Sequence, residues 1–194
     1  MPVLASFSAN AAGDTAVHEP LSKVFDANPA PADPKVVQQL TSLGVIVSPV
    51  AKEKNLLEVS CINYGSFDNA KASLLAQIAD NIVWLRLDNT AVTDDALLQI
   101  GKLKNLVRLN LSGTAVTSTG MQALSALKNL EYINIVGTKA DDKTLLILST
   151  IPSLKSIYCW NSLITSSGVE NFKKKMPAIH VESGDGGGVK GGNP

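Results

Sequence analysis

The chain has 194 residues, of which 45% are hydrophobic and 18% charged, and its 17 basic residues balance 17 acidic ones. This length suffices for one domain with a sizeable core. The zero formal net charge argues against a nucleic-acid-binding protein, because such proteins usually carry a basic excess. No apolar run approaches the ~20 residues of a membrane-spanning helix, so we expect no direct membrane insertion.

Residues 1–33 are expected to form a lead-in and a proline-rich linker. Small and polar residues dominate the start, and residues 28–34 contain three prolines. Between these stretches, residues 20–27 can form a short helix with Leu21, Val24 and Phe25 on one face. At the other end, residues 183–194 are rich in glycine and predict a flexible tail.

The main domain is expected to span residues 34–182 and to begin with an N-terminal cap at residues 34–62. Asp33 is a plausible N-cap residue, Pro34 suits the first helical position, and Gly44 is a natural stop. Two strands should follow this helix, at residues 45–50 and 56–62. Residues 63–182 then hold the repeats and the C-terminal cap, beginning with a helix near residues 69–79 and ending with a strand near residues 178–181.

The central part of the chain repeats one pattern every 24 residues. An apolar residue opens each unit at positions 82, 106, 130 and 154, and further apolar residues (a cysteine once) follow three and five positions later. A fixed period of this size is typical of stacked supersecondary units. The alternation of apolar and polar positions predicts a short strand with one buried face in every unit.

Each predicted strand is followed by a turn and then by a helix. Positions 89, 113, 137 and 161 hold only asparagine or glycine, the residues that best tolerate a positive φ. A hydroxyl residue follows each of them and can satisfy backbone groups of the turn. Three positions after this hydroxyl residue stands a good N-cap residue, namely Thr93, Thr117, Asp141 or Thr165. Successive strands should therefore be parallel and adjacent, with right-handed crossovers.

This pattern resembles the leucine-rich repeat family. The match is L-x-x-L-x-L-x-x-(N or T), then x-(V or I)-(T or D) and a helix, over roughly residues 56–181. Threonine or serine stands where many members of the family carry asparagine, and the turns at residues 89–94 and 113–117 look like those of a bacterial 24-residue type. The expected fold class is α/β: a leucine-rich-repeat solenoid with a parallel β-sheet on the concave face and α-helices on the convex face.

A narrower resemblance concerns residues 33–50 and 55–59. They look like the segment before the C-terminal repeats of planctomycete-type cytochrome c membrane proteins, and residues 158–160 and 168–172 are similar to that family's last repeat. This resemblance implies a periplasmic or other extracytoplasmic location, and a role as a structural C-terminal appendage of a bacterial membrane-bound cytochrome-like redox protein. The chain contains no Cys-x-x-Cys-His haem attachment site, so we expect no cofactor in it.

Groups that could carry chemistry are few. Asp94-Asp95 and Asp141-Asp142 are paired carboxylates, but each pair lies where a helix begins, and acidic residues favour that end of the helix dipole. The only histidines, His18 and His180, lie at opposite ends of the chain without ligands at metal-binding spacing. Cys61 and Cys159 occupy inward positions about 20 Å apart by strand spacing, too far for a disulfide. We therefore expect no catalysis and no metal site.

The outward positions of the strands hold the candidate site. Arginine and aromatic residues, which anchor many protein interfaces and can stack on a sugar or a peptide, concentrate there. The alternative is that exposed strands favour tyrosine and tryptophan in any case and that these rings only cover their neighbours. We expect a non-catalytic binding module that uses its concave sheet to hold an unidentified protein or peptide, or a carbohydrate. The candidate contact residues are Trp84, Arg86, Asp88, Arg108, Asn110, Tyr132, Asn134, Tyr158 and Trp160.

Overall fold

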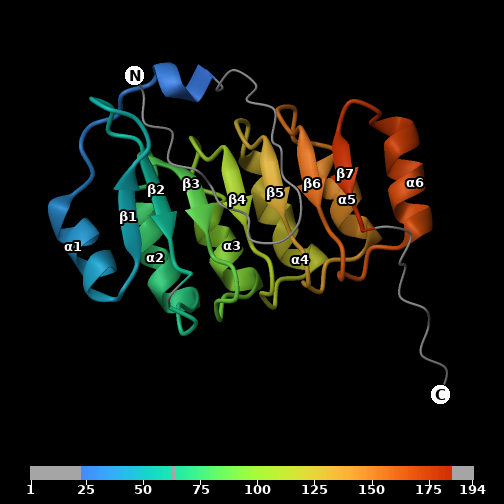
Figure 1. Cartoon of the computed structure of the whole chain (residues 1–194), viewed down its shortest axis with the longest axis horizontal. Coiled ribbons are helices and arrows are strands. Elements are labelled where there is room, and N and C mark those ends of the chain that lie inside the picture. Colours follow the sequence, from blue (N-terminus) through green and yellow to red (C-terminus); the bar gives the residue numbers. More distant parts are fainter. Residues whose placement is uncertain (1–22, 63, 185–194) are drawn as a thin grey trace.

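The computed structural model describes residues 23–62 and 64–184, which form one seven-stranded sheet with helices behind it (Figure 1). The strands lie in the sheet in the order of the sequence. They are β1 (Ile46–Pro49), β2 (Leu57–Ser60), β3 (Ile82–Arg86), β4 (Arg108–Asn110), β5 (Tyr132–Asn134), β6 (Ser156–Tyr158) and β7 (His180–Glu182). The helices are η1 (Lys23–Asp26), α1 (Pro34–Ser42), α2 (Asn69–Gln77), α3 (Asp94–Ile100), α4 (Ser118–Met121), η2 (Gln122–Ala126), α5 (Asp142–Leu148) and α6 (Ser166–Lys175).

The pairing of the strands confirms the predicted leucine-rich-repeat solenoid. From β3 to β7 each residue pairs in parallel with the residue 24 positions later, as Leu85 with Leu109 and Ile157 with Val181. The step from β2 to β3 is longer: Val59 of β2 pairs with Leu85, which lies 26 positions later. The register also shifts between residues 57 and 58. β1 is the exception in direction, since it runs antiparallel to β2.

The core lies between the sheet and the helices and runs the length of the solenoid. It contains the inward residues of every strand, such as Leu85, Leu109 and Ile133, together with helix residues such as Leu97 and Leu148. Cys61 and Cys159 belong to it, as predicted for small apolar residues, and both are free thiols. No helix in the described part of the chain is long and apolar enough to cross a membrane.

The turns after the strands have the predicted left-handed conformation. The φ angles are 57° at Asn89, 67° at Gly113, 66° at Gly137 and 55° at Asn161. The hydroxyl that follows each of them donates to the carbonyl three residues earlier, over 2.6 Å from Thr90 to Leu87 and 2.7 Å from Thr138 to Ile135. Since these hydroxyl residues are buried, each such bond satisfies a carbonyl that water reaches poorly.

A second ladder of hydrogen bonds joins neighbouring helices at their N-termini. The first residue of one helix binds the N-cap residue of the next. Asp94 accepts from Thr117 N at 2.7 Å and from Thr117 Oγ1 at 2.6 Å, and Asp142 accepts likewise from Thr165. The aspartates predicted to favour the helix dipole thus lie in the first turn and also tie each repeat to its successor.

The N-terminal end of the solenoid is closed by α1 and β1. Asp33 caps α1 by accepting from Lys35 N at 2.8 Å, and Pro34 is the first helical residue, as predicted. β1 carries Pro49, which suits an edge strand because proline donates no ladder hydrogen bond. The solenoid therefore begins on a strand that is poorly suited to pairing with another chain.

The described end of the lead-in packs onto this sheet. The short helix expected at residues 20–27 is a 3-10 helix, η1, while Leu21 lies outside the described residues. Val24 is buried with Leu56, Val83, Trp84 and Val107 in a second apolar cluster, against which Phe25 packs. Two asparagine side chains bind the segment that follows η1: Asn55 donates to Pro29 O and Asn81 donates to Ala30 O. The domain boundaries at residues 33 and 182 remain predictions, and the predicted tail lies mostly outside the described residues.

Candidate functional site

The strands present one continuous surface on the side away from the helices, which we call the sheet face. Strand register aligns its side chains in rows. The first row is Glu58, Trp84, Arg108, Tyr132, Ser156 and His180, and the second is Ser60, Arg86, Asn110, Asn134, Tyr158 and Glu182. A third row, just past the strands, contains Asp88, Ser112, Val136 and Trp160. All nine predicted contact residues lie in these rows, and whether they bind a partner remains a prediction.

Five residues of the two strand rows are missing from the predicted contact residues; one of them, Ser156, lies within the regular repeats and was left out as a small polar side chain among arginine and aromatic residues. Glu58 and Ser60 lie on β2, where the step of 26 residues conceals them from a search with a period of 24. His180 and Glu182 lie on β7, one 24-residue repeat after Ser156 and Tyr158. Extending the 24-residue count by one unit would have found this second pair.

The sheet face near β3 is occupied by the chain itself. Trp84 is only 4% exposed, and its ring centroid lies 6.3 Å from that of Phe25. The guanidinium of Arg108 lies 5.3 Å from the centroid of the Trp84 ring, within the range of a cation–π interaction. Trp84 therefore supports the fold here and offers little surface to a partner.

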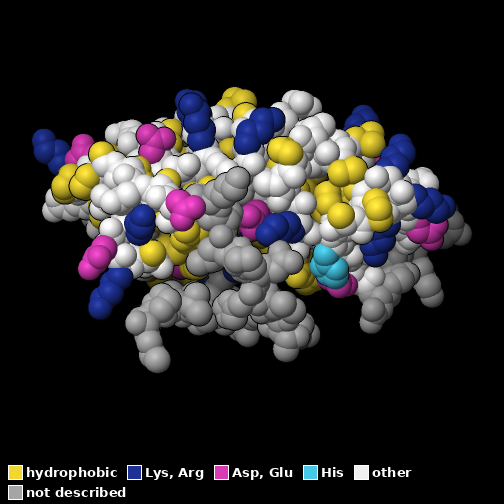
Figure 2. Space-filling model, turned by 90° about the horizontal axis from the view of Figure 1, so that it is seen from above, with side chains coloured by type: hydrophobic (Ala, Val, Ile, Leu, Met, Phe, Trp, Pro, Cys, Tyr) yellow, Lys and Arg dark blue, Asp and Glu magenta, His cyan; other side chains and the backbone are white. Residues whose placement is uncertain are grey.

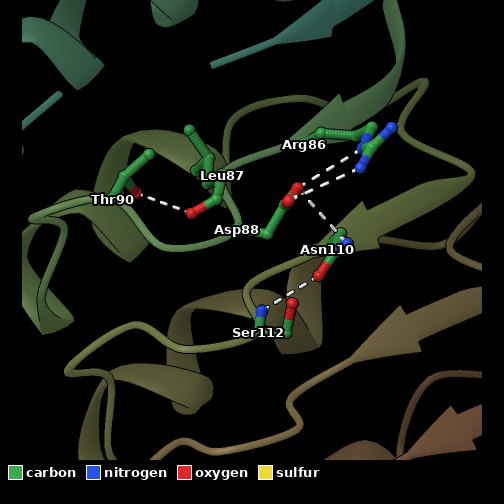
Figure 3. Close-up of polar contacts among 6 residues, drawn as sticks. All are labelled: Arg86, Leu87, Asp88, Thr90, Asn110 and Ser112. Carbon is green, nitrogen blue, oxygen red and sulfur yellow. Dashed lines mark hydrogen bonds and ion pairs between the residues drawn. The ribbon is translucent and has the colours of Figure 1, made fainter. Parts of the chain in front are cut away.

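A small polar network joins the ends of β3 and β4 (Figure 3). Arg86 Nε and Nη2 lie 3.3 and 3.4 Å from the two carboxylate oxygens of Asp88, and Asn110 Nδ2 lies 3.4 Å from Asp88 Oδ1. The Asn110 side-chain oxygen accepts from Ser112 N at 2.9 Å. In the next repeat, Asn134 accepts from Val136 N at 3.0 Å. Both asparagines thus serve the ends of their own strands, and Arg86 and Asp88 neutralise each other.

Glu58 belongs to the same region. Burial raises the pKa of its carboxyl above the usual range, and the nearby guanidinium groups of Arg86 and Arg108 partly offset that increase. Glu58 is the register partner of Trp84, which in turn pairs with Arg108. A carboxylate, an aromatic ring and a cation therefore follow one another across three adjacent strands.

The sheet face near β6 is aromatic. Tyr158 lies at its centre, with ring centroids 4.9 Å from Tyr132, 6.0 Å from Trp160 and 6.1 Å from His180. We call these four residues the aromatic cluster. Glu182, the register partner of Tyr158, borders it with a side chain that is 43% exposed.

Charged groups flank the aromatic cluster on two sides. Glu131 and Lys155 form an ion pair of 3.4 Å where β5 and β6 begin. A depression of about 750 Å³ lies along β7, lined by His180 and Glu182 and, from the helix layer, by Lys173. Figure 2 views the solenoid from above, at right angles to the view of Figure 1, and shows basic and acidic side chains interspersed among the described residues of this upper side.

The groups with potential for metal or nucleophilic chemistry are scattered or buried. Residues 23–62 and 64–184 contain no group of three histidine, cysteine, aspartate or glutamate side chains that could hold a metal ion. Burial raises the pKa of the Cys61 thiol to about 12 and that of Cys159 to about 11. Both thiols therefore stay protonated near neutral pH, which makes them poor nucleophiles.

No family model matches the chain, and no curated protein matches its sequence. Two similar solved structures are a leucine-rich-repeat protein of Leptospira interrogans and an internalin of Listeria monocytogenes, with 18% and 16% identity and TM-scores of 0.44 and 0.39. Each alignment covers 57% of this chain, but only 27% and 36% of the respective solved chains.

Proposed function

We propose that this leucine-rich-repeat chain is a non-catalytic binding module whose sheet face holds a protein or peptide. The supporting observation is the gathering of aromatic and charged side chains from five parallel strands in register on one surface. Such residues supply much of the binding energy in protein interfaces. The aromatic cluster, and not the buried Trp84, is the part of the predicted site that we assign to the partner.

Three of the four carboxylates considered for catalysis have other tasks, which supports a non-catalytic role. Asp94 and Asp142 each accept two hydrogen bonds from the next repeat. Asp141 caps α5 and bonds with Ser118. A carboxylate held in this way is poorly placed to exchange protons with a substrate.

The proposal is tested by selecting ligands from a displayed peptide library and measuring their affinities for two matched double variants. Tyr132→Ser with Trp160→Ser alters the sheet face. Leu98→Ser with Leu146→Ser alters the helix side, where both leucines are about 60% exposed. We expect at least a tenfold loss of affinity from the first pair only, because removing one or two interface anchors costs about 1.4 kcal/mol or more. Equal binding by the sheet-face variant and the unaltered chain would refute the proposal.

A structural role at the C-terminus of a cytochrome-like redox protein is the alternative that the sequence resemblance implies. The elements that carry most of that resemblance, α1 and β1, close the first repeat of the solenoid, a task that they perform with either function. The length of the native gene tests this alternative. A parent protein that starts at Met1 would exclude it.

A further inference from the structure

We propose that the outer edge of β7 is a second binding site, to which an extended peptide segment of a partner protein adds as an eighth strand. β7 is the last strand of the described sheet and pairs with β6 on its other side (Figure 1). A peptide that adds to a sheet edge is held by backbone hydrogen bonds, and its alternate side chains supply specificity. The site uses the edge of the sheet and not the aromatic cluster, so it goes beyond the proposed function.

The register of β7 on β6 determines which of its backbone groups point outward. His180 N donates to Lys155 O at 2.7 Å, and Glu182 O accepts from Cys159 N at 2.9 Å. His180 and Glu182 thus direct their backbone groups toward β6. Because this direction alternates along a strand, the N–H and carbonyl of Val181 point away from β6, and no described residue forms a backbone hydrogen bond with them.

The two ends of the sheet differ in their suitability for pairing. At the first end, β1 contains Pro49, which cannot donate a ladder hydrogen bond. β7 contains no proline, and Val181, whose N–H points outward, is its middle residue. Sheets commonly protect an exposed edge by proline, a bulge or a covering segment, and an unprotected edge is a template for another strand.

The depression along β7 provides room beside this edge. Its volume of about 750 Å³ lies within the range of about 300–1,000 Å³ typical of ligand pockets. Residues 177–184 line it on one side, and Lys173 lines it from the helix layer. Lys173 is exposed, and it takes part in none of the ion pairs of the described residues. Its charge is therefore available to an acidic side chain.

The opposite wall, on the side of the sheet face, carries a negative charge. One carboxylate oxygen of Glu182 accepts from Gly184 N at 3.3 Å, and the other lies 3.9 Å from His180 Nε2. The Glu182 side chain remains 43% exposed. The depression therefore has a basic wall toward the helices and an acidic wall toward the sheet face.

These two charges specify the chemistry of the added strand. Successive side chains of a strand point to opposite faces, so one side chain faces the helix layer and its neighbours face the other way. An acidic residue in the first position meets Lys173, and a basic neighbour meets Glu182. The partner segment is thus an extended peptide in which an acidic residue stands beside a basic one.

The test uses the isotope-labelled full chain and a blocked pentapeptide, Val-Lys-Glu-Lys-Val. A matched peptide carries N-methyl groups on the glutamate and on the lysine after it, which removes a donor from each of its two edges. Binding is followed through the NMR signal of the Val181 amide. We expect the first peptide to move the Val181 proton downfield with a Kd on the order of 1 mM, and the methylated peptide to bind at least about fivefold more weakly.

Two pairs of variants separate the edge from the charge. Ser183→Pro removes the next outward N–H, whereas Ser183→Ala retains it. Lys173→Gln removes the charge that lines the depression, whereas Lys174→Gln removes an exposed neighbouring charge that does not line it. We expect the proline variant and Lys173→Gln to bind the pentapeptide about three- to fivefold more weakly, and the other two variants to bind it as the unaltered chain does. Equal affinities within either pair would overturn the inference.

Hydrogen exchange in the absence of peptide tests for other occupants of the edge. The Val181 amide should exchange faster than the His180 amide, which donates to Lys155. Equally slow exchange at all protein concentrations would show that the chain covers its own edge, and protection that rises with concentration would show that a second copy does. Either result would overturn the assignment to a peptide partner.

This inference and the proposed function can fail separately. The variant with Tyr132→Ser and Trp160→Ser should bind the pentapeptide as the unaltered chain does, since neither residue lines the depression. Loss of pentapeptide binding in that variant would place the peptide on the sheet face and would contradict the edge site alone.

Discussion

Gly120 is a helical glycine that alanine should not be able to replace. It lies in α4 with an ordinary helical conformation, where alanine would normally stabilise the helix by about 1 kcal/mol. However, a Cβ at this position would collide with Asp94 Oδ1 and would lie 2.7 Å from its Cγ and 2.8 Å from its Cα. These distances are too short, so the side chain of Asp94 or the spacing between α3 and α4 must change.

The expected cost follows from what Asp94 does. Its carboxylate accepts from both the backbone and the hydroxyl of Thr117, and a displaced carboxylate loses both hydrogen bonds. Hydrogen bonds to charged groups contribute about 1.5–3 kcal/mol each, and water can replace part of this because the site is only partly buried. After subtracting the helix preference for alanine, we expect Gly120→Ala to lower the free energy of unfolding by about 2 kcal/mol.

The neighbouring repeat shows how the loss can be reversed. There Ser118 takes the place of the aspartate and Thr144 that of the glycine, and Thr144 Oγ1 lies 3.0 Å from Ser118 Oγ. The double variant Asp94→Ser with Gly120→Thr copies this pair. It should be more stable than the sum of its single variants predicts, by about 1–2 kcal/mol of coupling.

Urea unfolding of the single and double variants, followed by circular dichroism, measures these differences. Gly168→Ala is the comparison variant, because the three atoms nearest its Cβ all belong to the Asp142 side chain, and the two hydrogen bonds that Asp142 accepts from Thr165 are exposed, so water replaces them more easily. It should cost less than Gly120→Ala. A Gly120→Ala variant as stable as the unaltered chain, or a double variant without coupling, would refute the reasoning.

The further predictions concern buried groups and a residue that covers one of them. Thr114→Val removes the 2.6 Å hydrogen bond to Leu111 O and should lower the free energy of unfolding by about 1–2 kcal/mol. Ser60→Ala removes a buried hydroxyl without a partner among the described residues, so it should be neutral or stabilising by up to about 1 kcal/mol. Urea unfolding measures both. Phe25→Ala, made in a Trp160→Phe background, should shift the fluorescence of Trp84 to longer wavelength as water reaches the ring; unchanged emission would show that Phe25 does not shield it. Cys61 and Cys159 should react with a thiol reagent at pH 8 only after unfolding. Because burial raises both pKa values above 9.0, the unfolded chain releases these protons first, and stability should fall as the pH rises from 9 towards 11–12, less steeply in a Cys159→Ala variant.

Much of the solenoid could be predicted because its determinants lie within one repeat. The inward residues Leu109 and Leu111 follow from alternation along a strand. The left-handed turn at Gly113 and the hydroxyl of Thr114 depend on residues no more than three positions apart. The repeat then makes each observation available several times, which is why both the spacing and the side-chain direction are correct.

The candidate site was predicted as a surface, but not as a set of interactions. Strand alternation places Trp84 and Trp160 on the same face, and the structure agrees. It could not distinguish the two rings, because Trp84 is covered by Phe25, a residue 59 positions away in a segment without any repeat. Glu58 was missed for a related reason, since the longer first step breaks the period.

By itself, the sequence determines the repeat, the parallel order of the strands after the cap, the turns and the composition of the sheet face. Each of these depends on local conformational preferences that recur with a fixed period along the chain. Only the tertiary structure decides that β1 runs antiparallel, that Asp94 and Asp142 connect successive helices, and that one end of the sheet face is occupied by Phe25 and Arg108. These features depend on contacts between units that differ in sequence, and no period predicts which side chains will meet there.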